Sequence, residues 1–278
     1  MIVEDRFSRN VALFGHAGQE RISASVVGVV GLGGLGSHVA QQLVYLGVRD
    51  LTYVDHDRIT TSSLNRVVTA VEDDASLTAK VDAAARLTHA VAVDAHIVAL
   101  RARLEDAHAQ KALARCTSIV GCLDSDTARI GLIDLCARNR IPFFDLATGT
   151  GAEEGIAWYG GRALFSGEGE RCPSCMDLLD QRAMSLAAMD SAQRETDDRI
   201  YGVQRDALGG TGPAVVGLNG VVSSLAVMEW MVWTTGLRQP RALLEYRGAN
   251  GAVFASSDEP AAGCYYCGLW RRPTVAPS

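Results

Sequence analysis

Short apolar runs alternate with amphipathic stretches along the first half of the chain. Runs that are rich in Val, Ile and Leu and bounded by turn residues are typical of strands in a parallel sheet covered on both faces. Strands are expected over residues 25–30, 50–54, 95–100, 118–122 and 141–146. Helices are expected over residues 37–47, 78–90, 105–114 and 126–138. Because right-handed crossovers join such elements, the pattern predicts a doubly wound, Rossmann-like α/β fold with a mostly parallel sheet.

The pattern changes after Gly149. Two short runs, residues 155–159 and 163–165, are typical of a hairpin. Residues 243–246 and 253–256 are further expected strands. The second half is therefore expected to add C-terminal strands to the same sheet.

One long apolar stretch and one long polar stretch lie between these expected strands. Residues 213–233 are apolar but interrupted by polar residues such as Asn219 and Glu229, which favours a buried helix over a membrane span. Residues 176–212 are charged and end in a cluster of glycines, which is typical of a mobile lid or a crossing loop.

Composition narrows the classes of partner. The 26 basic and 32 acidic residues give a net charge of −6, and no stretch is strongly basic, which argues against binding of nucleic acid. Residues 1–10 are charged and contain no apolar run, which argues against a secretory signal. We expect a cytoplasmic protein that binds neither nucleic acid nor membrane.

A glycine-rich loop joins the first expected strand to the first expected helix. It reads Gly31-Leu-Gly33-Gly34-Leu-Gly36, and Asp55 closes the second expected strand. Glycines let the backbone turn tightly and approach a phosphate, and the helix N-terminus offers free N–H groups. An acidic residue at the end of the second strand is placed to bind a ribose hydroxyl. The loop predicts a nucleotide site, and this motif alone would favour NAD.

Three charged residues favour a triphosphate over NAD. Arg66 and Lys80 follow Asp55 within one βα unit, and two cations at the carboxyl edge of a sheet suit a triphosphate. Asp124 lies just past the fourth expected strand, where a carboxylate that faces phosphates is useful mainly as a Mg²⁺ ligand. Taken singly, the two cations could be solvated surface groups, and Asp124 or Asp126 could be a helix N-cap. Their convergence on one edge of the sheet favours a site.

Four of the seven cysteines form two Cys-x-x-Cys pairs. They are Cys172 with Cys175 and Cys264 with Cys267. Two such pairs separated by a long insertion are typical of a tetrahedral zinc site with four cysteine ligands. A redox dithiol is the alternative, but such a pair follows an early βαβ strand at a helix N-terminus. The sequence therefore predicts a structural zinc knuckle, and Cys116, Cys122 and Cys136 are expected to be buried.

In this order along the chain, the residues resemble the ubiquitin-activating-enzyme-like (ThiF/MoeB/HesA) adenylyltransferases. The resemblance is greatest to the bacterial enzymes that activate sulfur-carrier proteins for molybdopterin and thiamine synthesis. The matching segments are Arg6-Phe-Ser-Arg9-Asn10, Gly18-Gln19, Gly31 to Ser37, Leu51-Thr-Tyr-Val-Asp55-His-Asp57, Leu64-Asn65-Arg66, Lys80, Asp124 and the two cysteine pairs. They span nearly the whole chain.

The resemblance implies a nucleotide site for ATP. By position, Asp55 would bind the ribose, and Arg66 and Lys80 would hold the triphosphate. Asp57 and Asn65 belong to the same matched nucleotide-binding segments. The family often has Asn where Ser63 stands, Gln where Asn10 stands and Gln where Val67 stands.

The resemblance also implies adenylation of a C-terminal carboxylate on a ubiquitin-like or sulfur-carrier protein that ends in Gly-Gly. Asp124 would hold Mg²⁺, and Arg9 would be an arginine finger from the other subunit of a homodimer. No cysteine lies between Cys175 and Cys264, where members that form thioesters or acyl disulfides place theirs. Adenylation without a later covalent transfer is therefore expected.

One domain is expected over residues 1–278, since no repeat, low-complexity tract or linker divides the sequence. It would comprise a helical arm (1–24), a nucleotide-binding half (25–150) and a half for substrate and zinc (151–278). Two alternatives to a carrier-activating enzyme remain. The same chemistry would serve a short peptide or natural-product precursor, or the chain would be a non-catalytic partner subunit of a heterodimeric activating enzyme.

Overall fold

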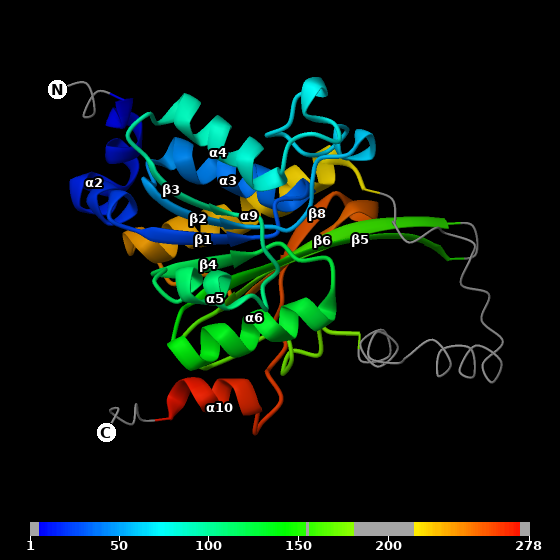
Figure 1. Cartoon of the computed structure of the whole chain (residues 1–278). Coiled ribbons are helices and arrows are strands. Elements are labelled where there is room, and N and C mark those ends of the chain that lie inside the picture. Colours follow the sequence, from blue (N-terminus) through cyan, green and yellow to red (C-terminus); the bar gives the residue numbers. More distant parts are fainter. Residues whose placement is uncertain (1–5, 154–155, 181–213, 273–278) are drawn as a thin grey trace.

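A mixed sheet lies at the centre of the computed structural model, which describes residues 6–153, 156–180 and 214–272 (Figure 1). Its strands are β1 (Val26–Val30), β2 (Asp50–Val54), β3 (His96–Leu100), β4 (Ser118–Gly121), β5 (Phe143–Glu153), β6 (Ile156–Ser166), β7 (Leu243–Arg247) and β8 (Ala252–Ala255). Their order across the sheet is β3-β2-β1-β4-β5-β6-β7-β8. The first five in this order are parallel, and β6 to β8 pair antiparallel. The predicted doubly wound fold with additional C-terminal strands is confirmed.

Helices cover both faces of this sheet. They are α2 (Ser8–Ser23), α3 (Gly34–Leu46), α4 (Lys80–Val91), α5 (Ala107–Leu113), α6 (Asp126–Asn139), α9 (Val216–Thr235) and α10 (Tyr265–Arg271). In Figure 1, α2, α3, α4 and α9 lie on one face, and α5, α6 and α10 lie on the other. Two separate apolar cores match these two layers.

The apolar helix expected over residues 213–233 is α9. Because it is apolar nearly all round, it has to be packed on more than one side. It contacts α3 and α2 on one side and β5 and β6 on the other. Trp230 is fully buried, and its Nε1 donates a hydrogen bond to the Ser118 hydroxyl at 2.9 Å. Among the described helices, α9 is the one long and apolar enough to span a membrane, yet 56% of its most apolar window is buried in the fold.

The prediction that residues 155–159 and 163–165 form a hairpin is wrong. Both runs belong to the single strand β6, which pairs antiparallel with β5 along its whole length. The sequence Gly160-Gly161 between the two runs is typical of a turn, but here these glycines lie within the strand and allow neighbouring groups to pack closely against it. A Cβ at Gly160 would lie 2.5 Å from the carbonyl oxygen of Tyr246 on β7.

The long polar segment expected over residues 176–212 is described only as far as residue 180. The remainder lies outside the described residues.

β1 and β4 are neighbours in the sheet, although β2 and β3 come between them in the sequence. The winding of the chain therefore reverses between β1 and β4, and ligands of open α/β sheets bind outside the carboxyl ends of the strands at such a switch point. The loop after β1 carries Gly31, and the loop after β4 carries Asp124. The fold thus places the expected nucleotide loop beside the expected metal-binding carboxylate.

Candidate active site

The glycine loop turns directly from β1 into α3. Gly31 has φ = +88°, and α3 begins at Gly34 with Gly33 as its N-cap, three residues earlier than the pattern predicts. A Cβ at Gly36 would lie 1.8 Å from the carbonyl oxygen of Gly31, so the helix can pack on the loop only without a side chain there. Around Gly33 a Cβ would meet no atom within 4 Å. The loop therefore exposes its backbone and the N-terminus of α3 to a space where a phosphate fits.

Asp55 is buried at the end of β2 and fixes this loop. Its Oδ2 accepts a hydrogen bond from the backbone N–H of Leu32 at 2.6 Å, and its Oδ1 accepts one from the N–H of Asp57 at 2.8 Å. The Nζ of Lys80 lies 3.8 Å from Oδ2 of Asp55 and 2.7 Å from Oδ2 of Asp57. Partial burial alone would raise the pKa of Asp57, but the hydrogen bond and charge of Lys80 outweigh it and hold that pKa below its usual range. The structure thus brings Lys80 together with both carboxylates.

Arg66 lies in the loop between β2 and α4, close to the start of α3. Its guanidinium donates to the carbonyl of Ser62 and to Oδ1 of Asn65, so its described contacts are within its own loop. The N–H of Val68 donates to the Ser37 hydroxyl at 3.1 Å, which ties this loop to the first turn of α3. Arg66 and Asn65 are therefore near the glycine loop without contacting Asp55.

Asp124 lies in the turn between β4 and α6. Its side chain is exposed and makes no hydrogen bond or ion pair with any residue that the structure describes. The N-cap of α6 is Ser125, whose hydroxyl accepts from the N–H of Ala128 at 3.5 Å, so neither Asp124 nor Asp126 caps this helix. A Cβ at Gly31 would lie 2.5 Å from the carbonyl oxygen of Cys122, which shows that the two loops touch. An exposed carboxylate beside a phosphate cradle has the donor chemistry that Mg²⁺ requires.

Arg9 lies at the other end of the molecule. It is exposed on α2, and its neighbour Asn10 contacts the carbonyl of Leu46 at 3.4 Å, as does Gln19 at 3.0 Å. Leu46 ends α3, whose 13 residues span about 20 Å from the glycine loop. Arg9 therefore does not lie at the nucleotide loop of its own chain (Figure 1).

A groove opens on the sheet beyond the point where β4 ends. Gly121, the last residue of β4, pairs with Asp145, and β5 continues outward past it. The groove has a volume of about 320 Å³. Its lining residues are Ala147, Thr148, Gly149, Trp158, Gly160, Gly161, Arg162, Leu178, Glu245, Tyr246 and Arg247. We call it the glycine groove.

Trp158 shapes the glycine groove. A Cβ at Gly151 would lie 2.4 Å from Nε1 of Trp158, and one at Gly149 would lie 3.1 Å from its ring. The indole therefore lies across the glycines of β5. Since successive residues of a strand alternate between faces, Trp158, Gly160 and Arg162 lie on the same face as Gly149. The groove therefore has the Trp158 indole and the strand backbone of β5 and β6 among its walls.

The sequence does not single out a buried group of charges beside this groove. Arg129 of α6 donates to Asp145 of β5, and Nη2 of Arg162 lies 3.4 Å from the other oxygen of Asp145. Asp145 is 2% exposed and Arg129 5% exposed. A lone Asp within the apolar run 141–146 is a signal that could have found the group.

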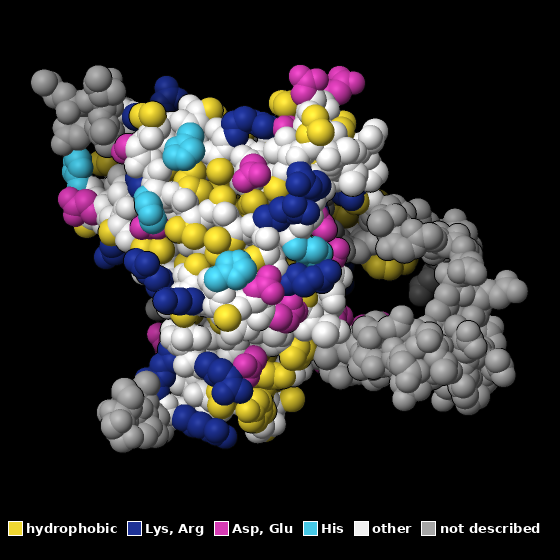
Figure 2. All heavy atoms as spheres, viewed as in Figure 1, with side chains coloured by type: hydrophobic (Ala, Val, Ile, Leu, Met, Phe, Trp, Pro, Cys, Tyr) yellow, Lys and Arg dark blue, Asp and Glu magenta, His cyan; other side chains and the backbone are white. Residues whose placement is uncertain are grey.

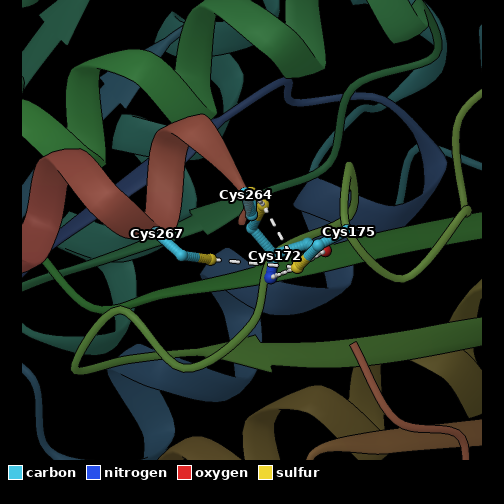
Figure 3. A group of neighbouring side chains, drawn as sticks. All are labelled: Cys172, Cys175, Cys264 and Cys267. Atoms are coloured by element: carbon cyan, nitrogen blue, oxygen red, sulfur yellow. Dashed lines mark hydrogen bonds between the residues drawn. The ribbon is translucent and has the colours of Figure 1, made fainter. Parts of the chain in front are cut away.

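The four paired cysteines meet between the loop after β6 and the start of α10 (Figure 3). The Sγ atom of Cys172 lies 3.8 Å from that of Cys175 and 3.6 Å from that of Cys264, and the Sγ atoms of Cys175 and Cys267 are 3.8 Å apart. Four sulfurs placed tetrahedrally about zinc at 2.3 Å would be about 3.8 Å apart. Hydrogen bonding with Cys267 lowers the pKa of Cys172 to about 6. The residues present therefore fit a structural zinc ion.

Charged side chains of both signs are interspersed on the face shown in Figure 2. Lys and Arg side chains there lie next to Asp and Glu instead of gathering in one basic area.

Comparison with known proteins places these features in one family. The model described as the ThiF family matches residues 7–266. The sulfur carrier protein ThiS adenylyltransferase of Escherichia coli is 26% identical over 266 residues, which cover 95% of this chain and 94% of that protein. The molybdopterin-synthase adenylyltransferase of Escherichia coli is 30% identical over 178 residues, covering 63% and 68%. The SAMP-activating enzyme E1 of Haloferax volcanii is 34% identical over 140 residues, 50% of this chain and about half (52%) of that protein.

Solved structures share the fold at lower identity. The microcin C7 biosynthetic enzyme MccB in complex with N-formylated MccA has a TM-score of 0.72 and 17% identity, covering 94% of this chain and 74% of that one. PaaA has a TM-score of 0.65 and 18% identity, and the match covers 90% of this chain and 81% of that one. Because the family model matches residues 7–266, most of the chain, the chain belongs to the ThiF family, and together with the named relatives this identifies it as an adenylyltransferase.

Proposed function

We propose that this protein uses ATP to activate the C-terminal carboxylate of a ubiquitin-like or sulfur-carrier protein as an acyl-adenylate. The observation that carries the proposal is the contact between the glycine loop and the Asp124 turn at the switch point of the sheet. This contact puts a phosphate cradle beside a carboxylate that pairs with none of the residues that the structure describes. The relatives named as ThiS and molybdopterin-synthase adenylyltransferases support the substrate class.

The reaction needs charge neutralisation and alignment more than a protein nucleophile. A carboxylate oxygen of the acceptor attacks the α-phosphorus of ATP, and the bond from that phosphorus to the bridging oxygen breaks and releases pyrophosphate. Asp55 would hold the ribose, and Lys80 and Arg66 would neutralise the triphosphate. Asp124 would hold Mg²⁺, which supplies further neutralisation of the phosphates when bound. In-line positioning of two anions is then the main contribution of the site.

The glycine groove is the proposed path of the acceptor's C-terminal segment. β5 passes the end of β4 at Asp145, so residues 147–149 lie about 7 to 14 Å further out, beside the Asp124 turn. The groove volume of about 320 Å³ would hold an extended chain with small side chains beside the Trp158 indole, which itself covers Gly149 and Gly151. A tail that ends in Gly-Gly meets this requirement.

Arg9 would complete the site from a second subunit. It is exposed and remote from the glycine loop of its own chain, so a role as an arginine finger requires a homodimer. Because one anion attacks another in this reaction, such a cation would stabilise the transition state by neutralising negative charge.

A short peptide precursor is the second candidate acceptor. The structural likeness to MccB in complex with N-formylated MccA, with a TM-score of 0.72, favours it. The groove volume of about 320 Å³ would accept a few extended residues of either kind of acceptor.

ATP–pyrophosphate exchange distinguishes these candidates. The assay would use the full chain with a carrier protein ending in Gly-Gly, the same carrier lacking its last glycine, and short peptides with free or amidated C-termini. Exchange that requires the intact Gly-Gly carboxylate supports the carrier assignment, whereas exchange with free peptides alone supports the peptide candidate. Exchange that appears only after another family member is added would instead identify a non-catalytic partner subunit.

A further inference from the structure

Two buried residues, Arg129 and Asp145, form a network of charges with the partly buried Arg162 next to the Asp124 turn. We call it the Asp145 network. Asp145 accepts from the Arg129 guanidinium and lies 3.4 Å from Nη2 of Arg162. Burial of charged groups is unfavourable unless each is paired and hydrogen-bonded, and here the carboxylates of Asp145 and Asp126 balance the two guanidiniums. Burial correspondingly lowers the pKa of Arg162.

The contacts of Arg129 point toward Asp124. One Nη atom donates to Asp145 and to the carbonyl of Leu146 at 2.9 Å, and the other donates to the carbonyl of Leu123. Its Nε lies 3.2 Å from Oδ1 of Asp126. Leu123 directly precedes Asp124, so Arg129 holds the peptide group that carries the Asp124 Cα.

Asp124 itself has no side-chain partner among the described residues. The position of its carboxylate therefore depends on the backbone on either side. Arg129 fixes the carbonyl before it, and Arg129 also pairs with Asp126 two residues after it. The planar fork of a guanidinium can reach these groups together, whereas a single ammonium cannot.

We infer that Arg129 is a positioning residue for the Asp124 carboxylate, and that Asp145 holds the Arg129 guanidinium in the required orientation. The inference rests on the proposed function, in which Asp124 binds the metal of Mg·ATP. Arg129 touches neither nucleotide nor acceptor in this scheme. It acts through the Leu123 carbonyl.

The Asp145 network also extends to the glycine groove. Nη2 of Arg162 donates to the carbonyl of Leu178 at 3.0 Å, and Arg162 lines the groove. Oδ2 of Asp126 accepts from the N–H of Asp180 at 2.8 Å. The same buried charges thus connect the Asp124 turn with the groove wall.

Calorimetric binding of α,β-methylene-ATP, with Mg²⁺ and with EDTA, tests the inference without an acceptor. The metal should strengthen binding to the wild-type protein. Arg129→Lys keeps the charge but loses the fork, and should reduce the Mg²⁺-dependent gain in affinity at least tenfold while the affinity in EDTA stays within about twofold. Arg138→Lys is the matched control on α6, because Arg138 is exposed and its partners are Asp134 on the same helix and Tyr265 of α10, neither of which belongs to the Asp124 turn. It should keep the full gain.

Asp145→Asn is the second variant and carries the test if Arg129→Lys does not fold. The neutral amide should weaken the hold on Arg129 and reduce the Mg²⁺-dependent gain in the same direction. Two results would overturn the inference while leaving the proposed function intact. One is a Mg²⁺-dependent gain in affinity that is unchanged in both variants, and the other is a loss of affinity that is equal with Mg²⁺ and with EDTA. A wild-type protein that gains nothing from Mg²⁺ would instead contradict the proposed metal site itself.

Discussion

The Nζ of Lys80 lies 2.7 Å from a carboxylate oxygen of Asp57, beside the Asp55 carboxylate that holds the glycine loop. The Lys80 side chain is largely buried, and its hydrogen bond and charge outweigh partial burial and hold the pKa of Asp57 below its usual range. A lysine ammonium has three donors, so Lys80 could hold Asp57 and still donate to the oxygens of a triphosphate. The pair thus holds the ammonium in place before the nucleotide arrives.

Lys80→Ala should weaken ATP binding about ten- to a hundredfold, since a hydrogen bond to a charged group contributes about 1.5–3 kcal/mol. AMP should bind nearly as well as to the wild type, because it lacks the phosphates that Lys80 would contact. Titration with both nucleotides by calorimetry measures the difference. Lys111→Ala, an exposed lysine on α5, is the control and should leave both affinities unchanged. Equal losses for ATP and AMP would contradict the triphosphate role.

Asp124→Ala should abolish ATP–pyrophosphate exchange without destabilising the fold. The carboxylate is exposed and unpaired among the described residues, so its removal leaves no buried group unsatisfied. Loss of a metal ligand at the reacting phosphate costs several kcal/mol of barrier, so the exchange rate should fall at least about a hundredfold. Asp94→Ala, which removes an exposed carboxylate before β3, should exchange normally. The thermal midpoints of both variants should match the wild type.

Zinc should be present at one atom per chain, and Cys172→Ser should lose it. Cys172 is 2% exposed among the four clustered sulfurs, and the cluster joins the loop after β6 to α10. Because metal binding energy becomes folding energy, the variant should also unfold at a lower temperature. Elemental analysis and thermal denaturation measure the two effects. Cys116→Ser, which changes a buried cysteine outside the cluster, should retain its zinc. A wild-type protein without zinc and with a Cys172–Cys175 disulfide would refute the assignment.

Arg9→Ala and Asp124→Ala should each be inactive yet recover activity when mixed. In a hybrid dimer, one site combines an intact Asp124 turn with the intact Arg9 of the other chain. If subunits of an equal mixture exchange at random, half of the dimers are hybrids, and each hybrid has one intact site out of two. About one quarter of the wild-type pyrophosphate-exchange activity is therefore expected. Mixing Arg9→Ala with a chain that carries both substitutions should restore nothing. A fully active monomer, shown by sedimentation at assay concentration, would exclude the finger in trans.

The parts of the site that the sequence predicts are those tied to strand ends. The glycine loop, Asp55 and Asp124 each follow an apolar run directly, so a parallel sheet necessarily puts them on one edge. The cluster of four cysteines follows from spacing alone, because two Cys-x-x-Cys pairs are typical of a common metal site. In these elements the local sequence pattern and the residue types predict the same site.

The glycine groove and the Asp145 network depend on pairings that no local pattern contains. The contact between Trp158 and Gly151 depends on the antiparallel register of β5 and β6. The Gly160-Gly161 pair led to a hairpin where the strand is continuous, because glycine signals close packing as well as turns. Arg129 follows Asp126 at the i,i+3 spacing of an ion pair, but its link to Asp145 crosses from helix to strand.

The enzyme should release or transfer an acyl-adenylate without ever carrying its acceptor on a cysteine. No cysteine lies between Cys175 and Cys264, and four of the seven fit a zinc ion as ligands. Burial raises the pKa of Cys116 to about 11, so at pH 8 only about one molecule in a thousand would carry that thiolate. Burial raises the pKa of Cys122 and Cys136 as well, and buried thiols of this kind are poor nucleophiles.

Incubation with ATP, Mg²⁺ and an acceptor that supports pyrophosphate exchange tests this prediction by intact-mass measurement and non-reducing electrophoresis. Hydroxylamine should trap the activated acceptor as its hydroxamate, which shows that the adenylate formed, while the enzyme keeps its unmodified mass. A conjugate that a thiol reductant cleaves would contradict the prediction. In that case Cys122→Ser would be the first variant to examine, because Cys122 lies two residues before Asp124 and its carbonyl faces Gly31. Disappearance of the conjugate in that variant would show that the turn carrying Asp124 can open far enough to expose a buried thiol.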